Sequence, residues 1–274
     1  MVASATTERC LVVGVVNCTP DSFSDGGRFA QAEDAIREGL AQVEAGADWV
    51  DVGGESTRPG SVPVEPAEEQ RRVLPVIEAL ARTAGGRAKI SVDTYHAATA
   101  RAALEAGATI VNDISGGGLE PELLGVAAAR GATVVLGHLR GLPSTMMADV
   151  RFDDVVGEVA RELAAAVARA RAAGCREIWA DPGIGFGKRL EHNVSLLREL
   201  PRLIEALGVP LMVGVSRKAF IGQLTGRAPE ARVFGTAAAV TVAVLGGVSA
   251  VRVHDVAAMR DVVRVAEALR KSTS

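Results

Sequence analysis

Polar and charged side chains recur in this sequence directly behind short apolar runs, at the points where buried strands would end. In chain order these are Asn17, Asp51, Asp93, Asn112 and Asp113, His138, Asp181, Ser216 to Lys218, and Arg252 with His254. Carboxylates accept hydrogen bonds, amides donate and accept them, and arginine and lysine attract anions. Gathered on one surface, such groups would bind a small polar ligand.

Three of these residues suit a flat heterocycle that carries amino and lactam groups on its edge. Asp93 and Asp181 offer carboxylates that accept from pairs of N–H groups, and Asn112 offers an amide that matches an N–H/C=O edge. Each residue follows a different apolar run, so the ligand would be held from three strands.

Positive charge near the last apolar run indicates an anionic group on the ligand. Arg252 and His254 lie two residues apart, so on a strand their side chains point the same way. Lys218 and Arg58 could add to this charge. The chain as a whole carries a net charge of −3, which argues against a general nucleic-acid binder. Any cations that matter must therefore act locally.

Some of these residues also have ordinary structural explanations. An aspartate after a strand is often a helix cap or a turn former, and Asp51 and Asp113 fit that role as well as a ligand-binding one. His254 could be a buried histidine with satisfied hydrogen bonds, and Arg58 a solvated loop charge. The sequence leaves these alternatives open.

The elements that would position these residues follow one repeated pattern: an amphipathic helix, a glycine, four or five apolar residues, then a polar residue with a glycine-rich loop. The glycine suits a helix end, and an apolar run without alternation suits a strand buried on both faces. The pattern predicts eight strands, alternating with helices near residues 31–45, 65–84, 96–107, 120–130, 153–174, 191–207, 234–246 and 256–271. Eight such units in 274 residues are typical of a single-domain α/β fold, the (β/α)₈ TIM barrel.

An open doubly wound sheet is the rival architecture. Its first turn would carry a glycine-rich GxGxxG loop. Here the first apolar run ends in NCTPDS, at residues 17–22, so the barrel is favoured. Residues 1–9 have no hydrophobic core of their own and are expected to form a disordered tail, which leaves residues 10–274 as the barrel domain.

One uncharged run, between Arg232 and Arg252, is long enough to span a bilayer. Gly246, Gly247 and Ser249 interrupt it, and a buried helix, a turn and a short strand explain it better. Hydrophobic residues make up 48% of the chain and charged residues 23%, ordinary values for a soluble globular protein. We therefore expect no membrane partner.

The cysteines indicate a reducing compartment. Cys10, Cys18 and Cys175 form no CxxC or Cys/His metal-binding spacing. Their odd number, without a signal peptide, is typical of a cytoplasmic protein.

Eight segments in order resemble the dihydropteroate synthases, the folate-pathway family that sulfonamides inhibit. The segments are GVVNCTPDSFSDGG, DVGGESTRPG, SVDT, NDISGG, HLRGLPSTM, DPGIGFGK, GVSRKAFIG and RVHDV. The similarity extends over about residues 10 to 270. Each segment alone is modest evidence, whereas eight in the right order at plausible spacings are highly specific.

The resemblance implies a transferase that condenses 7,8-dihydropterin-6-ylmethyl diphosphate with 4-aminobenzoate, releasing diphosphate and forming 7,8-dihydropteroate, with Mg²⁺ as cofactor. The diphosphate would leave before the amine attacks, in an SN1-like step, because the electron-rich ring supports positive charge on its exocyclic methylene. The resemblance also implies mobile loops over residues 18–29 and 55–66, and a homodimer. The apolar faces of the helices at 191–207 and 234–246 could form its interface.

By the same resemblance, the expected site residues fall into overlapping groups. The pterin-binding group is Asp93, Asn112, Asp181 and Lys218, and the catalytic group is Asp93, Asp181, Lys218 and Arg252. The diphosphate group is Asn17, Arg58, Arg252 and His254, with Asn17 as the metal ligand. The aminobenzoate pocket is Thr57, Arg58, Pro59, Phe186 and Lys218.

Three places depart from the expected family pattern. Ala219 stands where many relatives have serine, so a hydroxyl for the aminobenzoate carboxylate is missing. Tyr95 and His96 are less usual after SVDT, and Gly137 precedes His138 where a bulkier residue is expected. These departures concern sulfonamide sensitivity and the shape of the aminobenzoate pocket, not the reaction class.

Two other functions are compatible with this fold. A pterin-binding methyltransferase barrel would pass a methyl group to a corrinoid partner, and it would not need the diphosphate site expected at RVHDV. An inactive or catalytically altered paralogue would have lost one of the expected pterin or diphosphate residues, and all of them are present. Diphosphate-dependent binding of Mg²⁺ would separate these functions.

Overall fold

The computed structural model describes residues 9–19, 27–58 and 60–270. The expected disordered tail lies outside the described residues except for Arg9. Residues 20–26 of the loop after the first strand, and Pro59 of the expected aminobenzoate pocket, also lie outside them. Residues 27–29, which the sequence assigned to that first loop, belong instead to the first helix.

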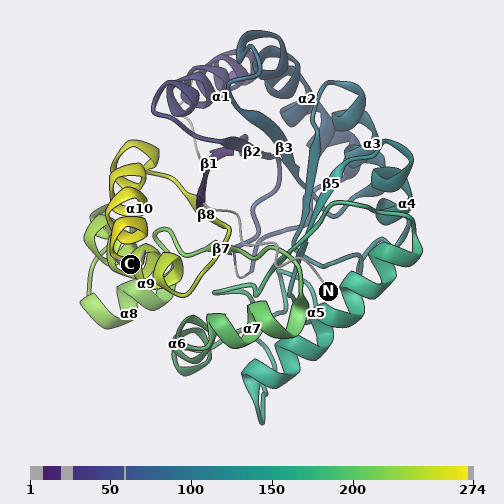
Figure 1. The fold of residues 1–274 in the computed structure, drawn as a ribbon. Coiled ribbons are helices and arrows are strands. Elements are labelled where there is room, and N and C mark those ends of the chain that lie inside the picture. Colours follow the sequence, from purple (N-terminus) through teal and green to yellow (C-terminus); the bar gives the residue numbers. More distant parts are fainter. Residues whose placement is uncertain (1–8, 20–26, 59, 271–274) are drawn as a thin grey trace.

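Eight parallel strands form the centre of the fold (Figure 1). They are β1 (Leu11–Asn17), β2 (Trp49–Gly53), β3 (Lys89–Asp93), β4 (Ile110–Asp113), β5 (Thr133–Gly137), β6 (Ile178–Asp181), β7 (Met212–Gly214) and β8 (Ala250–Val253). Their order is β6-β5-β4-β3-β2-β1-β8-β7, so the first and last strands are neighbours. An isolated parallel bridge between Ala180 and Leu211 links β6 to the start of β7 and completes the ring. The predicted TIM barrel is confirmed.

The helices surround this ring (Figure 1). They are α1 (Gly27–Glu44), α2 (Pro66–Thr83), α3 (Ala97–Glu105), α4 (Glu122–Ala129), α5 (Val155–Ala172), α6 (Leu190–Arg198), α7 (Leu200–Leu207), α8 (Ala219–Thr225), α9 (Val233–Leu245) and α10 (Val256–Arg270). The prediction of one helix over 191–207 was wrong, because α6 ends at Arg198 and α7 begins at Leu200, with Glu199 between them. Pro201, near the start of α7, has no N–H to continue the hydrogen bonding of α6. The short helix α8 was not predicted.

The uncharged run before Arg252 forms α9, a turn and β8, as predicted. Gly247 makes this turn with a φ of 92°, a conformation that favours glycine. Within the ranges that the structure describes, no helix is both long and apolar enough to cross a membrane.

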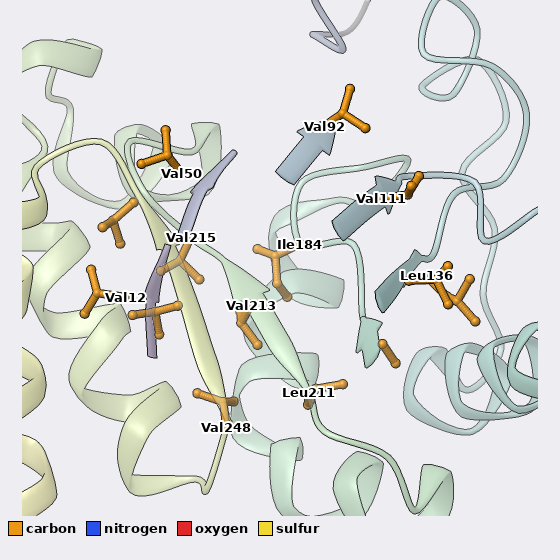
Figure 2. Close-up of a cluster of buried hydrophobic side chains, with 14 of the residues drawn as sticks. Val12, Val50, Val92, Val111, Leu136, Ile184, Leu211, Val213, Val215 and Val248 are labelled. Atoms are coloured by element: carbon orange, nitrogen blue, oxygen red, sulfur yellow. The ribbon is translucent and has the colours of Figure 1, made fainter. Parts of the chain in front are cut away.

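Along every strand except β3, alternating residues belong to two separate apolar clusters. Figure 2 shows part of the larger cluster, in which Val12, Val50, Val92 and Val111 are buried with side chains from the helices. The smaller cluster contains side chains at the alternate positions: Val13, Trp49, Ile110, Val135, Trp179, Met212 and Ala250. Burial on both faces explains why the strands read as continuous apolar runs.

The smaller cluster is an apolar floor inside the barrel. Trp49 and Trp179 meet there edge to face, with ring centroids 4.9 Å apart. On four of these strands the residue two positions further, on the same side of the strand, is polar: Asp51 after Trp49, Asn112 after Ile110, Asp181 after Trp179 and Arg252 after Ala250. The fold therefore stacks a polar layer on the apolar floor, at the C-terminal ends of the strands.

Candidate active site

One cavity at the C-terminal ends of the strands collects all four residues of the expected pterin-binding group. Its lining is Asp93, Asn112, Ile114, Gly137, Asp181, Gly183, Phe186, Gly214, Lys218 and Arg252. The polar members come from β3, β4, β6, β8 and the residue before α8. The parallel strands thus bring residues that are distant in the sequence to a single site, as expected for a barrel.

A partly buried arginine of this cavity joins two carboxylates. Arg252 donates from Nε to Asp51 Oδ2 at 2.6 Å and from Nη2 to Asp93 Oδ2 at 2.6 Å. Asn112 Nδ2 donates to the same Asp51 oxygen at 2.9 Å. The Asp51 side chain is only 1% exposed, so these partners must replace the water that its charge has lost.

The structure gives Asp51 and Asp113, whose roles the sequence left open, different surroundings. Asp51 is part of the buried polar layer, in contact with Arg252. Asp113 orders the turn after β4 instead, where it accepts from the Ser115 N–H at 2.8 Å and the Gly117 N–H at 2.6 Å. Strand alternation is the signal that could have separated them. Asp51 lies two residues after Trp49 of the barrel floor, whereas Asp113 directly follows Asn112 and points the opposite way.

Burial shifts the ionisation of the charged groups around the cavity. It raises the pKa of Asp93 to about 7, although Arg252 favours the anion. Burial also raises the pKa of Asp181, against the effect of the Gly183 N–H, which donates to Asp181 Oδ1 at 2.7 Å. For Lys218, burial lowers the pKa to about 8, although Asp181 favours the charged amine. The net charge of the site therefore changes within a narrow pH interval, between about pH 7 and about pH 8.

The glycine-rich loop after β6 places an aromatic ring over the lysine. Lys218 Nζ lies 3.9 Å from the centroid of the Phe186 ring, a cation–π contact. Gly185 adopts a φ of 83°, and a Cβ at that position would come within 3.0 Å of Lys218 Cδ. A larger residue would therefore crowd the lysine, which explains one glycine of the DPGIGFGK segment.

His138, a candidate because it follows β5, is not among the residues that line this cavity. Its Nε2 lies 3.0 Å from Glu162 Oε2, and its Nδ1 lies 2.9 Å from Lys188 Nζ. Lys188 also donates to the Phe186 carbonyl at 3.0 Å, and burial lowers the pKa of Lys188 to about 7. The sequence reasoning gave Lys188 no role, although it ends the DPGIGFGK segment. In the structure it anchors the loop that carries Phe186.

The expected diphosphate residues have different surroundings. The backbone N–H and ring Nδ1 of His254 lie 3.2 and 3.0 Å from Ser216 Oγ. Burial, and then the charge of Arg252, lower the pKa of His254 to about 4, so its ring is neutral near pH 7. Asn17 ends β1, and Arg58 is exposed on the loop between β2 and α2. Only Arg252 of this group lines the cavity.

Of the expected aminobenzoate residues, Phe186 and Lys218 line the cavity. Thr57 is partly buried on the loop between β2 and α2 and does not line it. For a metal ion, the described part of the chain contains no cluster of three or more His, Cys, Asp or Glu side chains that could hold one.

Comparisons with known proteins agree with this geometry. The family described as "Pterin binding enzyme" matches residues 13–254. A protein of Synechocystis sp. named dihydropteroate synthase is 47% identical over 265 residues, which are 96% of this chain and 91% of that protein.

Solved structures are similar over nearly the whole chain. The Xanthomonas albilineans dihydropteroate synthase with 4-aminobenzoic acid has a TM-score of 0.88 and 47% identity, and the match covers 96% of this chain and 93% of that one. The enzyme of the same organism in complex with 7,8-dihydropteroate has a TM-score of 0.85 and 44% identity, and it covers 96% and 94% of the two chains. The chain therefore belongs to the pterin-binding enzyme family and, within it, to the dihydropteroate synthases.

Proposed function

We propose that this chain condenses 7,8-dihydropterin-6-ylmethyl diphosphate with 4-aminobenzoate, forming 7,8-dihydropteroate and diphosphate for folate synthesis. The observation that carries this proposal is the cavity that Asp93, Asn112, Asp181 and Lys218 line together. The relatives solved with 4-aminobenzoic acid and with 7,8-dihydropteroate support the same substrate and product. Membership of the dihydropteroate synthases leaves the methyltransferase alternative without support.

The carboxylates recognise the pterin ring and favour the reaction. The ring donates N–H groups to Asp93 and Asp181 and pairs with the amide of Asn112. Diphosphate departs before the amine attacks and leaves positive charge on the exocyclic methylene. Asp93 and Asp181 stabilise that cation more than the neutral ring, and only such a difference accelerates the step. The aminobenzoate nitrogen is a free nucleophile near neutral pH, so no side chain has to act as its base.

The aminobenzoate binds between the cavity and the loop after β2. Phe186 supplies an apolar face at the cavity. Thr57 and Arg58 of that loop are the residues expected to complete the pocket, and Pro59, expected with them, lies outside the described residues. Ala219 is the first residue of α8, so its backbone N–H has no partner within the helix. This N–H can bind the aminobenzoate carboxylate in place of the missing serine hydroxyl.

Arg252 would assist the departure of diphosphate through its positive charge, and Asn17 would hold the Mg²⁺ ion that the family uses. In the strand register Asn17 pairs with Gly53, which pairs with Asp93, so the two residues end neighbouring parts of the same sheet. Mg²⁺ prefers oxygen ligands and usually keeps several waters beside substrate phosphates, so the Asn17 amide would supply one oxygen ligand. When bound, the ion neutralises charge on the leaving group. His254 contributes a neutral hydrogen-bonding ring, and the exposed Arg58 adds positive charge.

Asp93→Asn and Lys218→Ala are each expected to lower kcat/KM for the dihydropterin diphosphate at least about tenfold, which is about 1.4 kcal/mol. Each change removes a charged contact to the ring, and a coupled assay of dihydropteroate and diphosphate measures the effect. Lys89→Ala, at an exposed position that starts β3, is the matched control. Normal kcat/KM in both site variants would mean that this cavity does not bind the pterin.

The pKa values of Asp93 and Lys218 predict a narrow pH optimum. Asp93 becomes an anion as the pH rises through about 7, and Lys218 loses its charge as the pH rises through about 8. The profile of kcat/KM should therefore rise towards pH about 7 and fall above pH about 8. Lys218→Arg keeps its charge, so the alkaline fall should move to higher pH in that variant. A fall that stays in place would have to be assigned to a different group.

Arg252→Ala is expected to weaken diphosphate binding at least about tenfold in calorimetry with Mg²⁺, because a charge-assisted contact is lost. Since Arg252 also neutralises Asp51 and Asp93, circular dichroism must show that the variant is folded. Arg252→Lys, which keeps the charge, should retain part of the affinity. In Asn17→Ala the affinity should no longer depend on Mg²⁺. Unchanged affinity in Arg252→Ala would make this arginine a purely structural residue.

The proposed homodimer has its best candidate surface on α9. Phe234 is 86% exposed there, and Val242 and Leu245 are exposed further along the helix. By contrast, α6 and α7 contribute none of the large exposed hydrophobic side chains among the described residues, so the 191–207 part of the expected interface has less support. Phe234→Asp should convert the dimer to a monomer in sedimentation, whereas Val265→Asp on α10 should not. A monomeric parent protein would refute the proposal.

We place the protein in the cytoplasm. Cys10, Cys18 and Cys175 are all free thiols, as a reducing compartment would keep them. Cell fractionation tests this placement, and recovery outside the cytoplasmic fraction would contradict it.

A further inference from the structure

The turn from β7 to α8 contains an unusual backbone conformation directly before the active-site lysine. Arg217 has a φ of 56°, and it is the only residue other than glycine with a positive φ in the described ranges. This left-handed region is unfavourable for a residue with a Cβ, and side chains are found there mainly where the surroundings enforce it.

Three residues from other parts of the chain hold Arg217 in this conformation. Its N–H donates to the buried Thr236 Oγ1 of α9 at 3.1 Å, and its carbonyl accepts from Arg232 Nη1 at 2.9 Å. Its guanidinium donates to both oxygens of Asp255, from Nη2 at 2.6 Å and from Nε at 3.2 Å. The N–H, the carbonyl and the side chain of the strained residue are therefore all held from outside the turn.

The conformation of Arg217 determines the direction in which the next residue leaves the turn. Lys218 is extended, with a φ of −62° and a ψ of 156°, and its side chain runs into the cavity to reach Phe186. A relaxed, right-handed conformation at residue 217 would rotate the following peptide and redirect Lys218.

We propose that Arg217 is a positioning residue, whose left-handed turn, held by Asp255, Thr236 and Arg232, directs Lys218 into the cavity. The role deepens the proposed function, because it acts through the lysine assigned to the pterin. The Arg217–Asp255 pair itself is partly exposed, with side chains 34% and 27% accessible, and such pairs contribute little to global stability. The Arg217–Asp255 pair instead acts on the turn alone, where it maintains a backbone conformation that an arginine would otherwise avoid.

A rescue experiment tests this role, because glycine adopts a positive φ without any support. Asp255→Ala should lower kcat/KM for the dihydropterin diphosphate about tenfold or more. The double variant Arg217→Gly/Asp255→Ala should recover to within about threefold of the parent protein. Arg217→Ala/Asp255→Ala removes the same charges but keeps a Cβ, so it should stay impaired.

Two further measurements keep the outcome clear. Affinity for 6-hydroxymethylpterin, measured by fluorescence, should follow the same order of variants, and this readout works even if the parent protein forms no dihydropteroate. Thr236→Val, which removes the acceptor for the Arg217 N–H, should cause a smaller loss of the same kind and replaces Asp255→Ala if that variant does not fold. Parent-like pterin affinity in Asp255→Ala, or equal recovery in the glycine and alanine double variants, would overturn the proposal.

Discussion

Asp51 and Asp93 can share the interior of the barrel only because the guanidinium of Arg252 lies between them. Removing one partner of such a buried ion pair typically costs about 3–5 kcal/mol, because the other charge is left without water or a counterion. The arrangement depends on the strand order, which places β2 and β8 on either side of β1 although they are distant in the sequence. It also depends on the apolar floor below, where Trp49 and Trp179 exclude water from the barrel.

The same layer has one more acid than it has cations. Asp51, Asp93 and Asp181 face Arg252 and Lys218, and the burial of Asp93 and the neighbouring Asp51 charge both raise the pKa of Asp93. A ligand that donates N–H groups and gains positive charge during its reaction would compensate the excess negative charge of this layer. The electrostatics of the site therefore favour the cationic transition state that an SN1-like departure of diphosphate creates.

The expected pterin group was predictable because a parallel barrel places every strand end on one rim, so a polar residue after an apolar run is already located in space. The position of a residue at a strand end did not distinguish the inward-facing Asp51 from Asp113. To distinguish them, one must know which side chains of each strand point towards the barrel floor and count alternate residues from there. Pro201 shows a third case. A proline without an N–H is visible in the sequence, but a single helix was predicted over 191–207 without taking it into account.

The sequence by itself determined the order of the elements, the barrel architecture and the residues at the strand ends, because local patterns of burial and glycine-rich turns encode them. Only the tertiary structure decided which of those residues meet. It joined Arg252 to Asp51 and Asp93, turned His138 towards Glu162 and Lys188, and gave Arg217 its supports from α9 and Asp255. These contacts link residues far apart in the chain. Their distances and burial, and hence the pKa values of the site, arise only when all eight strands are packed around one axis.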